Sequence, residues 1–207
     1  NIFLNLKNSS ILGISEAVFP FIDGKSSISN IARRYPFTMI FKPLMFITSI
    51  LMIFYWINYE LFFKKIFPSK KKINYFTVYG ILSAIFLSLH ILFLGIENQN
   101  DSIKTVRKII IVSFIFFEVL AEFCLAKKLF DLQNILEKYM HKKIILAKMI
   151  FVRIIIFLTI VILLLLFVKD MGSEFKNMAE WNYFTFLLIF YFLSAIAWKR
   201  INPRSFP

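Results

Sequence analysis

Five apolar segments, each about as long as a bilayer is thick, constrain this sequence more than any other feature. A membrane-crossing α-helix needs about 20 consecutive, mostly apolar residues. Five stretches meet this requirement: residues 38–58, 74–95, 106–126, 144–168 and 181–198. Hydrophobic residues make up 59% of the 207-residue chain, more than a soluble domain of this length can enclose. We therefore predict an all-α fold, a polytopic transmembrane helix bundle with five visible spans.

The charged residues between these segments predict their orientation. The connections 59–73 and 127–143 and the tail from 199 carry 13 Lys and Arg residues, whereas 96–108 and 169–180 carry five. Basic loops remain on the cytoplasmic side of a membrane, so the first set is expected to be cytoplasmic. Four aromatic residues near the predicted span ends are expected to anchor the helices at the interfaces: Tyr55, Trp56, Trp181 and Tyr183.

This orientation divides the chain into three parts. Residues 1–37 form an outer-face segment, residues 38–198 the bundle, and residues 199–207 a cytoplasmic tail. The chain begins with Asn, and delivery of its first segment to the outer face requires a signal peptide or a preceding span. We expect a preceding span, which would give six spans in the complete protein.

The composition also excludes several kinds of site. The single cysteine, Cys124, allows no disulfide within the chain, and His90 and His141 have no metal-ligand spacing. No catalytic motif and no metal or cofactor site is predicted. The net charge of +13 lies in short loops without a nucleic-acid-binding motif. Membrane lipids, including anionic headgroups, are the expected partners, and nucleic acid is not.

Two carboxylates interrupt the third apolar segment, Glu118 and Glu122. An ionised side chain near the bilayer centre costs about 2.5–3.5 kcal/mol on insertion scales. Counted from the basic ends of the third and fourth segments, Glu118 and Arg153 lie nine and ten residues deep, and Glu122 and Lys148 each lie five deep. Equal counts in a helical hairpin mean equal depth. The spacing therefore predicts two intramembrane charge pairs, Glu118 with Arg153 and Glu122 with Lys148.

These pairs allow two interpretations. They either lock the third and fourth helices together or form part of a proton or substrate path through the bundle. A fully compensated pair is a poor proton carrier, because its acid is held ionised. The balance of charges in number and depth favours the structural interpretation.

A second candidate site lies at the outer face. Its residues are His90, Asp23, Ser27, Ser29, Arg33 and Arg34. The arginines suit lipid phosphates, and the histidine suits acid-base chemistry. The simpler alternatives are a headgroup-facing loop and a histidine that hydrogen-bonds to a neighbouring helix.

Short motifs at this face resemble the six-span DRAM/Sfk-like family, which includes autophagy modulators and a lipid-remodelling factor for GPI-anchored proteins. The matching residues are Pro20, Ile22, Ser27, Ser29, Ile40, Phe41, Lys42, His90, Glu180 and Trp181. The resemblance covers about residues 17–198 and lacks the first span of the family. It implies a polytopic protein of membrane lipid handling, with no established active site to transfer. A second six-span family of unknown function fits nearly as well.

Three functions follow as hypotheses. The first is a non-catalytic integral membrane protein associated with membrane lipid organisation or processing. The second is a proton-coupled small-solute transporter that uses Glu118, Glu122 and Arg153. The third is a lipid-modifying enzyme with an outer-face site near His90.

Overall fold

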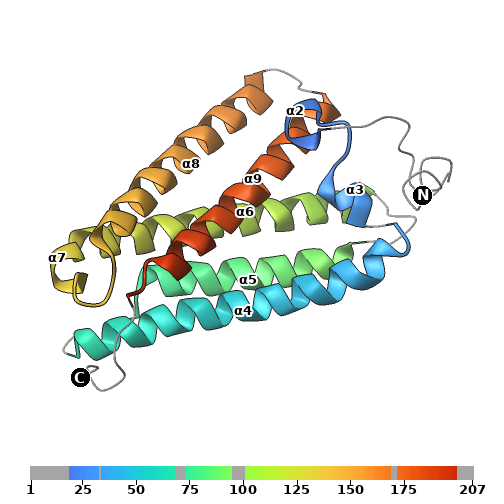
Figure 1. Ribbon diagram of the computed structural model, residues 1–207. Helices are drawn as coiled ribbons and strands as arrows, with labels where there is room; N and C mark the ends of the chain where they lie inside the picture. Colours follow the sequence, from blue (N-terminus) through green and yellow to red (C-terminus); the bar gives the residue numbers. More distant parts are fainter. Residues whose placement is uncertain (1–18, 33, 69–72, 95–100, 169–171, 200–207) are drawn as a thin grey trace, which may run out of the picture.

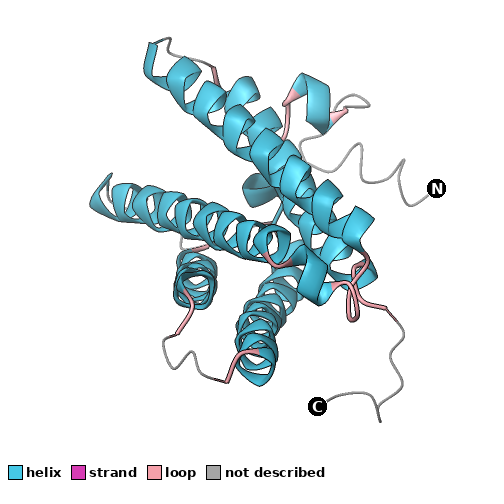
Figure 2. Ribbon diagram, turned by 90° about the vertical axis from the view of Figure 1, so that its left-hand side faces the viewer, coloured by secondary structure: helices cyan, strands magenta, loops and turns pink. Residues whose placement is uncertain are grey.

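The computed structural model describes residues 19–32, 34–68, 73–94, 101–168 and 172–199. Within these ranges the chain forms helices, turns and loops, and no β-strand (Figure 2). One isolated β-bridge joins Met140 and Trp198. The helices are α2 (Pro20–Asp23), α3 (Ile28–Ala32), α4 (Phe37–Ile66), α5 (Tyr75–Phe93), α6 (Asp101–Asp131), α7 (Gln133–Leu136), α8 (Lys142–Val168) and α9 (Ser173–Ile196).

Five of the described helices are long and apolar enough to cross a membrane. Their candidate spans are Phe37–Ile66, Tyr75–Phe93, Thr105–Asp131, Lys142–Ile162 and Ser173–Ile196. The predicted fold class, an all-α polytopic helix bundle, is therefore confirmed. The sidedness of its loops stays a prediction.

The first spanning helix is longer than predicted. It continues through residues 59–66, which the sequence analysis assigned to a connection. A salt bridge within the helix, 3.3 Å from Lys64 Nζ to Glu60 Oε1, supports this extension. Glu60 Oε2 also accepts hydrogen bonds from the backbone N–H of Asn74 at 3.1 Å and from Thr77 Oγ1 at 2.7 Å. The buried carboxylate thus holds the last turns of α4 against the start of α5.

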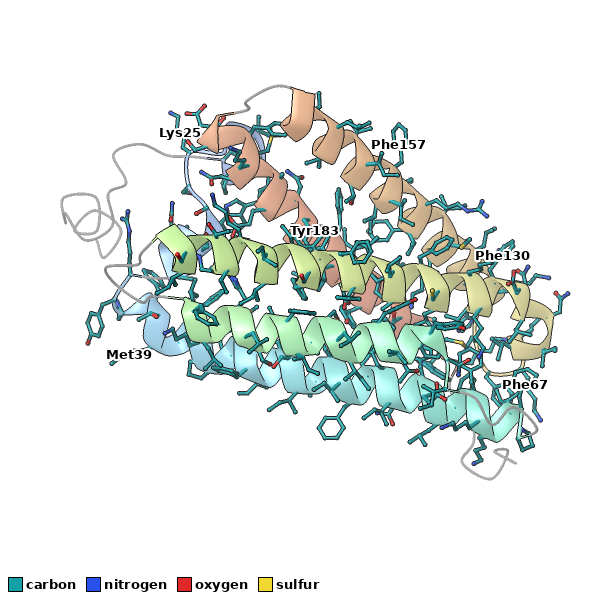
Figure 3. All side chains as sticks on the ribbon, turned by 180° about the vertical axis from the view of Figure 1, so that it is seen from behind. Lys25, Met39, Phe67, Phe130, Phe157 and Tyr183 are labelled. Carbon is teal, nitrogen blue, oxygen red and sulfur yellow. The ribbon has the colours of Figure 1, made fainter. Side chains whose placement is uncertain are left out.

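The spanning helices form two groups. Helices α4, α5 and α6 run side by side, with α5 packed against both neighbours (Figure 1). Helices α8 and α9 are inclined to these three, and α8 packs on α6 and α9 (Figure 1). The outer faces of this arrangement are apolar, as Met39 on α4 and Phe157 on α8 illustrate (Figure 3). Exposed apolar side chains of this kind suit contact with lipid tails.

The core between the helices is rich in aromatic side chains. Trp56 is 0% exposed, although its position in the sequence predicted an interface anchor. That prediction was wrong because α4 extends a further ten residues, which places Trp56 inside the bundle rather than at its rim. The indole packs directly on Gly80 of α5, where a Cβ atom would lie 2.2 Å from the ring. A small residue at this point lets two membrane helices approach closely.

The described part of the predicted outer-face segment is docked on the bundle. Helix α2 and the loop after it lie against α9 (Figure 1). The side-chain N–H groups of Asn177, Trp181 and Asn182 donate to backbone oxygens of this segment at 2.8–3.0 Å. In return, Glu180 Oε1 accepts a 3.1 Å hydrogen bond from the backbone N–H of Ser29. These contacts tie the segment before the first span to the start of the last one.

We expect Gly24→Ala to detach this segment from α9. Gly24 has a φ of 59°, a conformation that disfavours side chains, and its Cβ would lie 1.8 Å from the backbone oxygen of Glu174. Limited proteolysis in detergent should cleave the variant between α2 and α4 faster than the wild type. Gly172→Ala is the control, because a Cβ there meets nothing within 4 Å. Equal protection of all three proteins would contradict this docking.

Candidate functional site

Glu118 lies at the centre of a buried polar network between α5, α6 and α9. Its side chain is 0% exposed. Ser83 of α5 donates to Oε2 at 2.5 Å, and the hydroxyl of Tyr191 of α9 donates to Oε1 at 2.6 Å. Hydrogen bonds of this kind compensate part of the cost of burying a carboxyl group. Glu118 thus links three helices, one more than the predicted hairpin.

Lys148 occupies a second part of the same network. It is 1% exposed, and its Nζ donates to Ser194 Oγ at 2.5 Å and to the Tyr55 hydroxyl at 3.3 Å. The ammonium also lies 4.0 Å from the centre of the Phe190 ring, where the face of the ring attracts a cation. One lysine of α8 is therefore held by hydroxyl groups of α4 and α9.

Glu122 faces the same interior and is 2% exposed. It interacts electrostatically with Lys148, as the equal depths predicted, but their charged atoms do not come within the 4.0 Å of a salt bridge. Its Oε1 has no hydrogen-bond partner in the part of the chain that the structure describes. Glu122 and Lys148 therefore lie in the same buried interior, as predicted, but do not form a direct ion pair.

The predicted pairing of Glu118 with Arg153 is not formed. Both oxygens of Glu118 accept from Ser83 and Tyr191, whereas Arg153 is exposed on the outside of α8. The inward face of α8 carries Lys148 and Val152. Arg153 follows Lys148 by five residues, which turns it about 140° around the helix axis. Equal depth does not determine the direction in which a side chain points.

A pocket of about 360 Å³ lies beside this network, between α4 and α9. Its rim residues Asn58 and Ala195 are exposed. Side chains of the two helices meet at its wall, where the Tyr55 hydroxyl lies 2.8 Å from Ser194 Oγ. The pocket lies near the end of the bundle that carries the basic connections. It is lined by Tyr55, Asn58, Tyr59, Tyr191, Ser194, Ala195 and Trp198.

The pocket and the buried charges share side chains. Tyr191 lines the pocket and donates to Glu118, while Tyr55 and Ser194 line it and accept from Lys148. A molecule in the pocket would therefore lie one hydroxyl away from both charges. The wall hydroxyls can therefore hydrogen-bond to a polar group in the pocket. The charge of that group would act on the buried carboxyl and ammonium groups across one intervening hydroxyl.

The second predicted site, at the outer face, is not gathered into one place. His90 lies in α5, which packs between α4 and α6, whereas Asp23 ends α2, which packs on α9. The Asp23 carboxylate accepts from the backbone N–H of Phe19 at 3.0 Å.

The other members of that predicted site have local structural roles. Ser27 is buried; its Oγ lies 3.3 Å from Ser29 Oγ and accepts from the backbone N–H of Asn30 at 3.0 Å. Arg34 is half-buried at the entry to α4, and Arg33 lies outside the described residues. The two serine hydroxyls therefore stabilise the loop before α3, and their contacts give no indication that either serine is a nucleophile.

Several residues of the network were missed by the sequence analysis. Tyr55 and Tyr59 are four apart on α4, and Tyr191 and Ser194 are three apart on α9, so each pair shares a helix face. Polar hydroxyls repeated at helical spacing inside apolar spans were the available signal. Aromatic residues are also common near span ends, so the pattern alone does not distinguish an interface anchor from a buried hydroxyl.

The described residues contain no group of three or more His, Cys, Asp or Glu side chains that could hold a metal ion. Comparison of the chain with protein-family models, curated proteins and solved structures finds no match.

Proposed function

We propose that this integral membrane protein takes part in membrane lipid handling by binding one amphiphilic molecule in the pocket between α4 and α9. The observation that carries the proposal is the combination of an open, aromatic-walled pocket with hydroxyl groups and a buried ammonium directly behind it. Its volume of about 360 Å³ lies within the range of ligand sites.

The surface around the pocket supports an amphiphile rather than a wholly polar solute. From Asn58, the outward face of α4 continues through Phe54 and Leu51, which are 58% and 60% exposed. From Ala195, the outward face of α9 continues through Phe192 and Leu188, which are 63% and 53% exposed. These two rows of apolar side chains lead from the pocket toward the middle of the membrane. A ligand with its head in the pocket would lay its tail along them.

The test is to block the pocket and measure the bound lipid. We expect the wild type, purified in mild detergent, to retain about one lipid-class molecule per chain by native mass spectrometry, and Ala195→Phe to lose it, because the phenyl group fills the rim. Ala147→Phe is the matched control: Ala147 is exposed on α8 near the same end and does not line the pocket. Retention by Ala195→Phe, or no retained molecule in the wild type, would overturn the proposal.

A second candidate function, proton-coupled transport, is favoured by the charge count of the network. Among the side chains that the structure describes, Glu118 and Glu122 share the interior with a single ammonium, Lys148, since Arg153 lies outside. Two carboxyls facing one cation leave room for one exchangeable proton, unlike the balanced pairs that the sequence predicted. In proteoliposomes with an internal pH dye, candidate solutes should then drive proton movement in the wild type and in Glu137→Gln, but not in Glu122→Gln. A flat trace with folded wild-type protein would count against this function.

A further inference from the structure

The hydroxyl groups of the pocket wall differ in how far their hydrogen-bonding capacity is used. Ser194 Oγ donates to the Phe190 carbonyl at 2.8 Å, accepts from Lys148 at 2.5 Å and lies 2.8 Å from the Tyr55 hydroxyl. A hydroxyl has one hydrogen to donate and two lone pairs. The Ser194 hydroxyl is therefore fully used, with Tyr55 as the donor of their shared hydrogen bond.

What remains unused on the wall is donor capacity. The Tyr59 hydroxyl is buried in a side chain that is 3% exposed, and it has no hydrogen-bond partner among the described residues. Buried donors are normally satisfied, and an unsatisfied one costs about 1–3 kcal/mol. A molecule that fills this pocket is expected to bring acceptor atoms.

Charge near the pocket favours acceptors that are negative. The Lys148 ammonium lies directly behind Ser194 and Tyr55, and its two hydrogen bonds go to neutral hydroxyls. Lys148, Glu118 and Glu122 all lie behind the pocket wall; Lys148 contacts two of its hydroxyl groups, and Glu118 contacts one, that of Tyr191. The described residues at this end of the bundle also carry more bases than acids. The bases are Lys64, Lys65, Lys127, Lys128, Lys138, Lys142, Lys143 and Lys199, against Glu60, Asp131 and Glu137.

We infer that the pocket selects an anionic oxygen group, a phosphate or carboxylate at the head of the amphiphile, which accepts from Tyr59 and is attracted by Lys148. This inference rests on the proposed function, to which it adds the chemical class of the ligand. Aromatic walls alone would suit a quaternary ammonium. The unused Tyr59 donor and the nearby ammonium oppose a cationic head without acceptors.

The inference is tested by competition between lipid heads. The protein is reconstituted in nanodiscs of phosphatidylcholine mixed with phosphatidylglycerol, and the lipids that remain bound after transfer to detergent are identified by native mass spectrometry. We expect the anionic lipid to be enriched about tenfold over its share of the nanodisc, because hydrogen bonds to charged groups are strong. Inorganic phosphate is added in a parallel sample to separate a lipid head from a free anion.

Tyr59→Phe removes the unused donor and keeps the ring. We expect it to lower the enrichment of the anionic lipid about fivefold, while the total amount of bound lipid changes little. Tyr183→Phe is the matched control, because Tyr183 lies away from the pocket wall, toward the interior of the bundle (Figure 3). Thermal stability of both variants in detergent shows that neither effect comes from unfolding.

The outcomes separate the inference from the function on which it rests. Bound lipid without preference for the anionic head, or an unchanged preference in Tyr59→Phe, would overturn the inference and leave lipid binding in place. Absence of bound lipid from the wild type would overturn both. Displacement of the lipid by inorganic phosphate supports the anionic group and overturns the requirement for a tail.

Discussion

Replacing Gly80 with alanine is expected to destabilise the bundle by about 3 kcal/mol, at the upper end of overpacking effects. The added Cβ would lie 2.2–2.4 Å from three atoms of the Trp56 indole. The ring cannot move away easily, because it is wholly buried and packs against Tyr55, Phe76 and Tyr191. Helices α4 and α5 would have to separate. Thermal unfolding in detergent, monitored by size-exclusion chromatography, measures the loss.

A double-mutant cycle identifies the clash as the cause. In a Trp56→Leu background the ring is absent, and Gly80→Ala should become neutral or slightly stabilising, because alanine favours a helix over glycine by about 1 kcal/mol. Gly172→Ala, in open space, should change little. A Gly80→Ala effect of the same size with and without Trp56 would show that the close approach of α4 and α5 is not the reason.

The second large effect is expected for Lys148→Met. Methionine matches the length of the lysine stem but leaves Glu122 without the cation that it faces, and the Ser194 and Tyr55 hydroxyls without their donor. Breaking a buried charge pair on one side costs about 3–5 kcal/mol. We expect little folded protein after membrane extraction. Changing both Lys148→Met and Glu122→Gln should restore much of it.

Arg153→Met is the matched control on the same helix. Arg153 is exposed on α8 and, within the described residues, forms no hydrogen bond or salt bridge. This substitution should therefore leave the amount of folded protein unchanged or raise it, because an apolar side chain suits a lipid-facing position better than a charge does. If Arg153→Met lost as much folded protein as Lys148→Met, the result would indicate that Arg153 does pair with a buried acid.

The two predicted charge pairs show which features of the candidate site could be predicted from the sequence and which could not. Counting residues from the basic ends placed Glu122 and Lys148 at one depth, and the structure brings both into one interior. The same count placed Glu118 level with Arg153, yet Glu118 turns to Ser83 and Tyr191 instead. The partners of Glu118 come from α5 and α9, which lie outside the α6–α8 hairpin on which the count was made. No spacing within that hairpin contains this information.

The sequence alone determined that this chain crosses a membrane several times, and approximately where, because the cost of exposing backbone and polar groups to lipid depends on length and composition and needs no tertiary contact. The tertiary structure decided which faces meet: it buried Trp56, turned Arg153 outward and placed hydroxyls of α4 and α9 around one pocket. The reason is physical. Lipid tails are as apolar as the spans, so hydrophobicity inserts the helices without choosing their neighbours. Close packing and buried hydrogen bonds make that choice.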